Sequence, residues 1–208
     1  MRQLLLSDTF IGMFLQVLPL ACLVGLLYAI LRYALLKSKK QSILWRTEAL
    51  RLLFVCYVTG LINLVLVPNN LWNSFWFGIF TKQPILGLGE LFRPDFSYNF
   101  TSVFYECLIG ERILGDWVLR MLIGNALMFV PMGILLPLAW SKITSRCMLF
   151  LSWILPLVIE LLQPMIGRSF DIDDLLMNVS GILIGYGVVS FVRAIMKAIR
   201  SKHKAIST

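Results

Sequence analysis

The sequence predicts an all-α protein that crosses a membrane about five times. Hydrophobic residues make up 59% of its 208 residues and charged residues only 14%, and the mean hydropathy is +0.82. The apolar residues gather in separate runs, most of them close to the roughly 20 residues that a membrane-spanning helix needs. A soluble domain of this size carries more charge. The predicted helices occupy residues 10–31, 52–67, 117–140, 147–165 and 174–192.

These helices divide the chain into four parts. Residues 1–68 hold two helices and a basic loop, residues 69–115 an aromatic connection, residues 116–192 a core of three helices, and residues 193–208 a basic tail. The first helix differs from a signal peptide, because its positive charges follow the apolar run and no small-residue cleavage site stands out. We therefore expect this helix to be retained.

The connection between the second and third helices is rich in aromatic residues. A cluster of Trp72, Phe75, Trp76, Phe77 and Phe80 opens it. Such a cluster is typical of an interfacial helix that lies at the depth of the lipid headgroups. A lip that binds a lipid-linked ligand is the alternative, and the interfacial helix is favoured because aromatic belts are common in membrane proteins.

The basic residues predict the orientation of the chain in the membrane. Thirteen of the 19 Lys and Arg residues fall in the loop at 32–51, the turn at 142–146 and the tail that begins at residue 193. Cytoplasmic segments carry an excess of such residues. We therefore expect a multi-pass protein of the bacterial cell membrane, with its N-terminus outside and its C-terminus in the cytoplasm, where the tail can lie on anionic lipid.

The composition excludes several classes of function. The four cysteines, Cys22, Cys56, Cys107 and Cys147, lack the spacing of metal ligands, so we expect neither a zinc site nor a disulfide framework. The one histidine, His203, lies in the tail, which leaves no histidine in the apolar body for a Ser-His-Asp or Cys-His arrangement. No nucleic-acid motif is present, and no cofactor is expected.

Polar side chains from distant parts of the sequence should meet near the outer ends of the last three helices. An ionisable side chain inside an apolar span is costly, and so marks a functional site by default. The predicted topology places Asn125, Glu160 and Asn178 at similar depth, beside the short polar link between the last two helices. The candidate ligand-binding residues are Asn125, Glu160, Gln163, Arg168, Asp171, Asp174 and Asn178.

Helical spacing places these side chains on particular faces. One face of the fourth helix holds Trp153, Pro156, Glu160, Gln163 and Gly167. One face of the fifth helix holds Asp174, Asn178, Gly181 and Gly185. The small-xxx-small spacing of the two glycines predicts close approach to a neighbouring helix. Gly124 and Gly133 of the third helix can act in the same way.

Each polar residue also has a purely structural interpretation. Asn125, Gln163 and Asn178 can hydrogen-bond helices together, and for them the two interpretations weigh equally. Glu160 can be a neutral buried acid or an anion paired with Arg168; an ion pair is a costly way to pack helices, which favours a functional role.

The aspartates of the polar link need separate treatment. We expect Asp173 or Asp174 to cap the fifth helix, which leaves Asp171 and Arg168 to face a ligand. A hard metal at Asp171, Asp173 and Asp174, with an Asn178 oxygen, is disfavoured because the spacing lacks the glycine and the distal glutamate of an EF-hand loop.

Several segments together resemble the VanZ-like family. They are residues 125–136 (NALMFVPMGILL), 160–163 (ELLQ), 167–174 (GRSFDIDD) and 178–181 (NVSG), followed by Gly185. The resemblance covers about residues 116–187. It implies a bacterial integral membrane protein, and the family is named for a protein that gives resistance to teicoplanin, a lipid-tailed glycopeptide, with little effect on vancomycin.

Three functions remain open from the sequence. The favoured one is a binding or membrane-remodelling protein that engages a lipid headgroup, a lipid-linked envelope precursor or a lipoglycopeptide, with Arg168 on a phosphate or carboxylate. The second is an enzyme on a lipid-linked substrate in which Glu160 is the acid or base; the absence of an evident nucleophile weighs against catalysis. The third is a proton-coupled transporter using Glu160, for which a homodimer could supply the paired halves of the usual plan.

Overall fold

The computed structural model describes residues 10–82, 93–111, 113 and 115–206. Five of the described helices are long and apolar enough to cross a membrane, which confirms the predicted all-α fold class. These helices are α2 (Phe10–Ser38), α3 (Trp45–Leu66), α7 (Asp116–Ala139), α8 (Ser145–Leu162) and α9 (Ile172–Ile206). The shorter elements are α4 (Asn69–Thr81), β1 (Tyr98–Asn99), α6 (Val103–Leu108), the 3₁₀ turn η1 (Gln163–Ile166) and β2 (Phe170–Asp171).

Several helices extend beyond the apolar runs that predict them. α2 continues to Ser38, α3 begins at Trp45, and α9 continues to Ile206. Lys and Arg are good helix formers, so a helix can continue through a charged segment beyond the end of its apolar run. As a result, most of the predicted basic loop at 32–51 is helical, and the connection proper is the short segment at 39–44.

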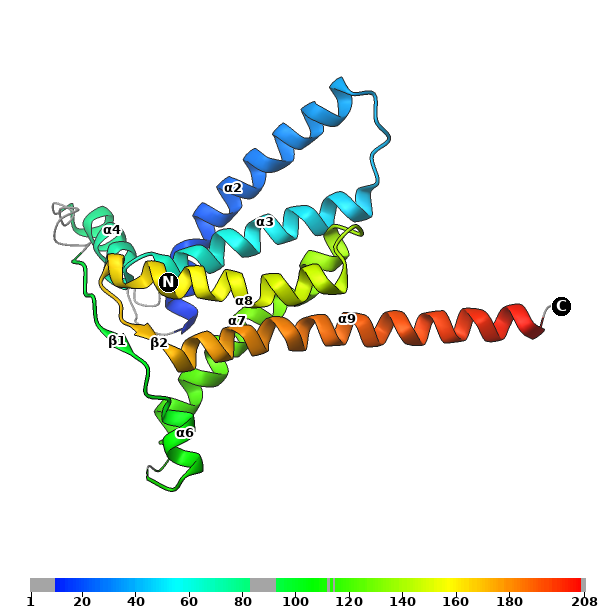
Figure 1. Cartoon of the computed structure of the whole chain (residues 1–208). Helices are drawn as coiled ribbons and strands as arrows, with labels where there is room; N and C mark the ends of the chain where they lie inside the picture. Colours follow the sequence, from blue (N-terminus) through cyan, green and yellow to red (C-terminus); the bar gives the residue numbers. More distant parts are fainter. Residues whose placement is uncertain (1–9, 83–92, 112, 114, 207–208) are drawn as a thin grey trace.

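The ends of the helices form two distinct sides of the molecule. The connection between α2 and α3, the turn between α7 and α8, and the C-terminal end of α9 lie at one end in Figure 1. The opposite end holds α4, the β1–β2 pair and α6. α9 projects past the other helices, as expected for 35 residues at about 1.5 Å of rise per residue. The predicted basic segments therefore share one side.

The centre of the bundle is the interface between α7 and α9. Phe129 of α7 and Ile182 of α9 are almost completely buried there. A Cβ atom on Gly181 would collide with the carbonyl oxygen of Ala126, one on Gly185 with that of Val130, and one on Gly133 with that of Ile182. The two helices approach this closely only because these positions are glycine, which confirms the predicted close approach.

Gly124 lies elsewhere on α7. It lines an open hollow with Arg120, Ile123, Leu127 and Met128. The prediction that both Gly124 and Gly133 support close helix packing is therefore borne out at Gly133.

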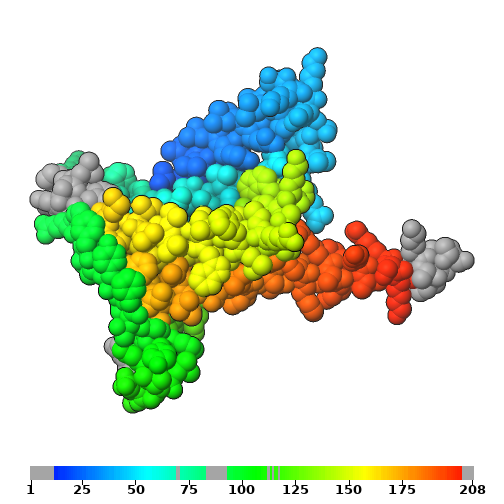
Figure 2. Space-filling model, viewed as in Figure 1, coloured from blue at the N-terminus to red at the C-terminus, as the bar shows by residue number. Residues whose placement is uncertain are grey.

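The segment from Arg93 to Leu108, called the crossing strip below, crosses the end of the bundle opposite the basic side (Figure 1). Strand β1 pairs in parallel with β2, matching Tyr98 with Phe170 and Asn99 with Asp171. The Asp95 amide donates to the Pro164 carbonyl at 2.9 Å. In Figure 2 the segment that holds β1 and α6 lies across the ends of α8 and α9. This strip brings residues about 70 positions apart in sequence into contact.

The aromatic cluster lies on α4, which packs against α2. The Trp76 indole donates to the Gln16 carbonyl at 3.2 Å, and the Gln16 side chain donates to that of Asn73 at 2.6 Å. Trp76 also stacks on Phe80. The helix that the aromatic residues predict is present, and its position at a membrane interface stays a prediction.

Candidate functional site

The candidate site begins where the chain reverses between α8 and α9. Gly167 follows η1 with φ of +83°, in the left-handed region that favours glycine. A Cβ atom there would also press on the carbonyl oxygen of Arg93 in the crossing strip. The reversal sets the end of α8 beside the start of α9 and brings Glu160 next to Asn178.

Glu160 is the centre of this cluster and is 0% exposed. Its Oε1 accepts a hydrogen bond from Nδ2 of Asn178 at 3.3 Å, and its Oε2 accepts one from the Asp171 amide at 3.3 Å. Burial of a carboxyl group is tolerated when such donors meet it. Two helices and strand β2 therefore converge on one side chain.

The buried face of α8 differs from the predicted face at Trp153 and at Gly167, which is exposed and lies beyond the helix, after η1. Ser152, Pro156 and Glu160 are buried at steps of four, and Gln163 continues this side of the helix. Trp153, which spacing had placed with them, is 52% exposed. Because steps of three and of four from Pro156 both satisfy helical spacing, Ser152 and Trp153 could not be distinguished from the pattern.

Arg168 does not pair with Glu160, so this alternative from the sequence is wrong. Its Nη1 donates to the carbonyl oxygens of Leu64 at 3.1 Å and Val65 at 3.3 Å. Nε2 of Gln163 donates to the same Val65 oxygen at 3.4 Å. The last carbonyls of a helix lack partners within it, and a guanidinium suits this negative end. Arg168 and Gln163 thus hydrogen-bond the C-terminal end of α3 to the site.

The three aspartates have different partners. Oδ1 of Asp171 accepts from the Asp173 amide at 2.9 Å, so Asp171 caps α9 and the prediction that Asp173 or Asp174 does so is wrong. Asp171 directly precedes the first residue of α9, where a side-chain oxygen best reaches the free amides. Its Oδ2 accepts from Nδ2 of Asn99 at 3.1 Å.

Asp173 and Asp174 point to other elements. Asp173 accepts from the Ser102 hydroxyl and from the Val103 amide at 2.7 Å, which joins α9 to the start of α6. Asp174 accepts from the Asn125 side chain of α7. Among the described residues, no group of three or more His, Cys, Asp or Glu side chains is arranged to hold a metal.

The predicted site residues therefore form two layers. Glu160, Gln163 and Asn178 are buried. The half-buried residues, which solvent or a ligand can reach, are Asn125, Arg168, Asp171 and Asp174. In the inner layer, the Asn178 Oδ1 atom is buried without a hydrogen-bond partner, and a buried acceptor of this kind costs about 1–3 kcal/mol.

Two residues of the site were missed from the sequence. Asn99 and Ser102 belong to the crossing strip and bond to Asp171 and Asp173. Ser102 could have been noticed as a serine at the N-cap of a helix. Its hydroxyl accepts from the Tyr105 amide at 3.1 Å and so caps α6. Nothing local indicates that Asn99 lies beside an aspartate 72 positions away.

The architecture defines the chain as a multi-pass membrane protein with a polar cluster at one end of an apolar bundle. More particularly, the chain belongs to the VanZ/LLP1 family, whose model matches residues 17–193. This match includes the first two helices, which the resemblance of individual motifs had left out. No curated protein and no solved structure is significantly similar to the chain.

Proposed function

We propose that the polar cluster faces the outside of the bacterial cell membrane and engages the headgroup of an amphiphilic molecule. The ligand would be a lipid headgroup, a lipid-linked envelope precursor or a lipoglycopeptide, and binding would contribute to resistance of the teicoplanin type. The excess of basic residues at the other end of the molecule supports the outward orientation.

The observation that carries this proposal is the convergence on Glu160. A fully buried carboxyl group within an apolar helix is expensive, and an apolar side chain would pack the same space at lower cost. Glu160 instead meets Asn178 and the Asp171 amide. The unpartnered Asn178 Oδ1 is a buried acceptor that a bound water can satisfy.

The outer layer supplies the groups that a headgroup needs. Asp171 and Asp174 present carboxylates, and Asn125 presents an amide, all half-buried. Arg168 bonds to Leu64 and Val65 through Nη1, and its Nη2 and Nε are further donors suited to a phosphate or carboxylate. The lipid tail of such a ligand would remain in the membrane beside the apolar helices.

Antibiotic susceptibility in a sensitive Gram-positive host tests the proposal. The strains would express no protein, the wild type, Glu160→Ala, Arg168→Ala or the control Arg146→Ala, with the membrane level of each protein measured. Arg146 is exposed at the start of α8, on the basic side. Teicoplanin and vancomycin would be compared, because they differ in the lipid tail.

We expect the wild type and Arg146→Ala to protect against teicoplanin and not against vancomycin. Glu160→Ala and Arg168→Ala should protect less at equal membrane levels. Equal protection by all four proteins would show that the cluster serves packing alone. If no protein protects, the resistance part of the proposal fails, and lipids bound to the purified protein would test the remainder.

A further inference from the structure

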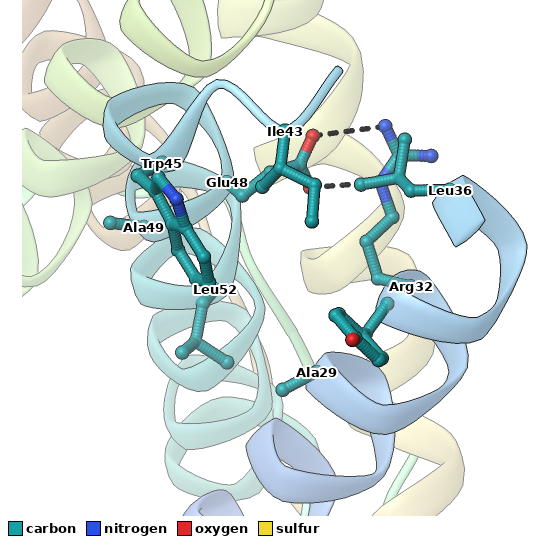
Figure 3. A pocket seen from close by; sticks show the side chains of 9 residues that line it. Ala29, Arg32, Leu36, Ile43, Trp45, Glu48, Ala49 and Leu52 are labelled. Carbon is teal, nitrogen blue, oxygen red and sulfur yellow. Dashed lines mark hydrogen bonds and ion pairs between the residues drawn. The ribbon is translucent and has the colours of Figure 1, made fainter. Parts of the chain in front are cut away.

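A hollow lies between α2 and α3, at the end opposite the polar cluster. Its volume is about 210 Å³, and its walls are mainly apolar. Ala29 of α2 and Ala49 of α3 line it with Leu36 and Leu52, as Figure 3 shows. The two small alanines leave the space open, and the helices separate toward their connecting loop in Figure 1. The shape is that of a slot between two membrane helices.

An ion pair between Arg32 and Glu48 lies at the rim of this hollow. Arg32 grips Glu48 through two hydrogen bonds, Nε to Oε2 at 2.8 Å and Nη2 to Oε1 at 3.0 Å, which Figure 3 marks with dashed lines. Arg51 donates to the same Oε1 at 2.6 Å. Two arginines, of which Arg32 lines the hollow and Arg51 lies next to it in the ion-pair cluster, share one glutamate, so the cluster keeps one excess positive charge. Nη1 of Arg32 takes no part in this paired contact and remains a donor for a further anion.

The connecting loop adds more positive charge in an unusual backbone conformation. The Lys40 amide donates to the Lys37 carbonyl and the Gln41 amide to the Leu36 carbonyl, both at 3.1 Å, which is the Schellman pattern that ends a helix. Lys40 occupies its left-handed position with φ of 49°, where glycine is usual. The Lys40 side chain adds a positive charge to this loop. Lys39 beside it is exposed.

We propose that this hollow binds one anionic phospholipid from the leaflet on the basic side of the molecule. An acyl chain would lie between α2 and α3, and the phosphate would meet Arg32 and the loop lysines. An apolar slot below a cationic rim matches this amphiphile, whereas a zwitterionic lipid brings its own positive group to the same rim. The site lies at the opposite end from the polar cluster and is independent of the function proposed above.

Lipid retention by the purified, full-length protein tests this inference. The protein in a neutral detergent would be mixed with phosphatidylglycerol or phosphatidylcholine of the same acyl chains, and bound lipid counted by native mass spectrometry. Ala29→Leu/Ala49→Leu fills the slot without changing charge. Ala194→Leu/Ala198→Leu on the exposed part of α9 is its matched control. Arg32→Gln/Glu48→Gln removes the arginine and keeps the net charge of the cluster.

The wild type and the α9 control should retain phosphatidylglycerol in preference to phosphatidylcholine. Both site variants should lose this preference, and Lys40→Gly should bind the anionic lipid about fivefold more weakly, the equivalent of about 1 kcal/mol for one basic residue at an anionic surface. Equal retention of the two lipids by the wild type would overturn the proposal. Retention by the filled variant at the wild-type level would overturn it as well.

A fluorescence measurement on the unaltered site keeps the inference testable if the filled variant does not fold. Trp45 lines the hollow, and brominated acyl chains quench a tryptophan that they contact. Brominated phosphatidylglycerol should quench the wild type more than brominated phosphatidylcholine does, and Trp45→Phe should remove this difference. A difference that persists in Trp45→Phe, or none in the wild type, would refute binding in this hollow.

Discussion

Replacement of Gly181 by alanine should force α7 and α9 apart. A Cβ atom at this position would collide with the carbonyl oxygen of Ala126 and lie 3.1 Å from the Cβ atom of Phe129. The carbonyl is part of the α7 backbone and cannot rotate away as a side chain could. Phe129 is 0% exposed, so it has little room to move. The helices must therefore separate over the whole close interface.

The cost can be estimated from the two opposing effects. Overpacking a close interface costs about 1–3 kcal/mol, and a collision with backbone belongs at the upper end of this range. Alanine regains about 0.5–1 kcal/mol over glycine in a helix. We therefore expect Gly181→Ala to lower the free energy of unfolding by about 2 kcal/mol.

Gly187→Ala is the matched control on the same helix. A Cβ atom there meets nothing within 4 Å, so this variant should be neutral or slightly more stable than the wild type. Reversible unfolding of both variants by denaturing detergent, followed by circular dichroism, would measure the difference. Equal stability of Gly181→Ala and Gly187→Ala would refute the close packing of α7 on α9.

Two further predictions concern hydrogen bonds that join different helices. Tyr57→Phe removes the hydroxyl that donates to the Met128 carbonyl at 2.7 Å, and should lower the unfolding free energy in the same assay by about 1 kcal/mol; an unchanged stability would argue against this tie between α3 and α7. Asp173→Ala leaves the Ser102 hydroxyl and the Val103 amide without their acceptor, and so removes the bonds that join α6 to α9. This variant should be cleaved faster by chymotrypsin within α6. The control Glu111→Ala, at an exposed residue, should be cleaved at the wild-type rate. Equal cleavage rates in the two variants would contradict the docking of α6 on α9.

The fold was predictable where the signal is local. Each membrane helix follows from a long, mainly apolar run, and Gly181-xxx-Gly185 predicted close helix contact without naming the partner. The helix ends were less predictable, because charged residues such as Lys37 and Arg46 lie outside the apolar runs but still belong to the helices. The pairing of Arg32 with Glu48 was missed for this reason, since it joins two helices across their shared connection.

The sequence indicated the polar residues of the last three helices and their link as candidates, but it indicated neither their hydrogen-bond partners nor Asn99 and Ser102 of the crossing strip. An ionisable residue in an apolar run such as Glu160 is conspicuous, and chain order brings it near Asn178. Which partner a long side chain reaches depends on the tertiary structure. Arg168 therefore bonds to carbonyl groups of α3 and not to Glu160. Asp171 became the cap of α9 because strand β2 ends directly before that helix. The crossing strip, which supplies Asn99, has no signal in the apolar pattern.

Identification of the molecules bound at the polar cluster tests the central claim most directly. Wild type, Glu160→Gln and the control Arg146→Ala would be purified from the same Gram-positive membranes in a mild detergent, and their bound lipids and lipid-linked precursors quantified by mass spectrometry. The account predicts an amphiphile that is enriched on the wild type and on Arg146→Ala and depleted on Glu160→Gln at equal protein amounts. The same bound molecules in equal amounts on all three proteins would contradict it and leave Glu160 with a role in packing alone.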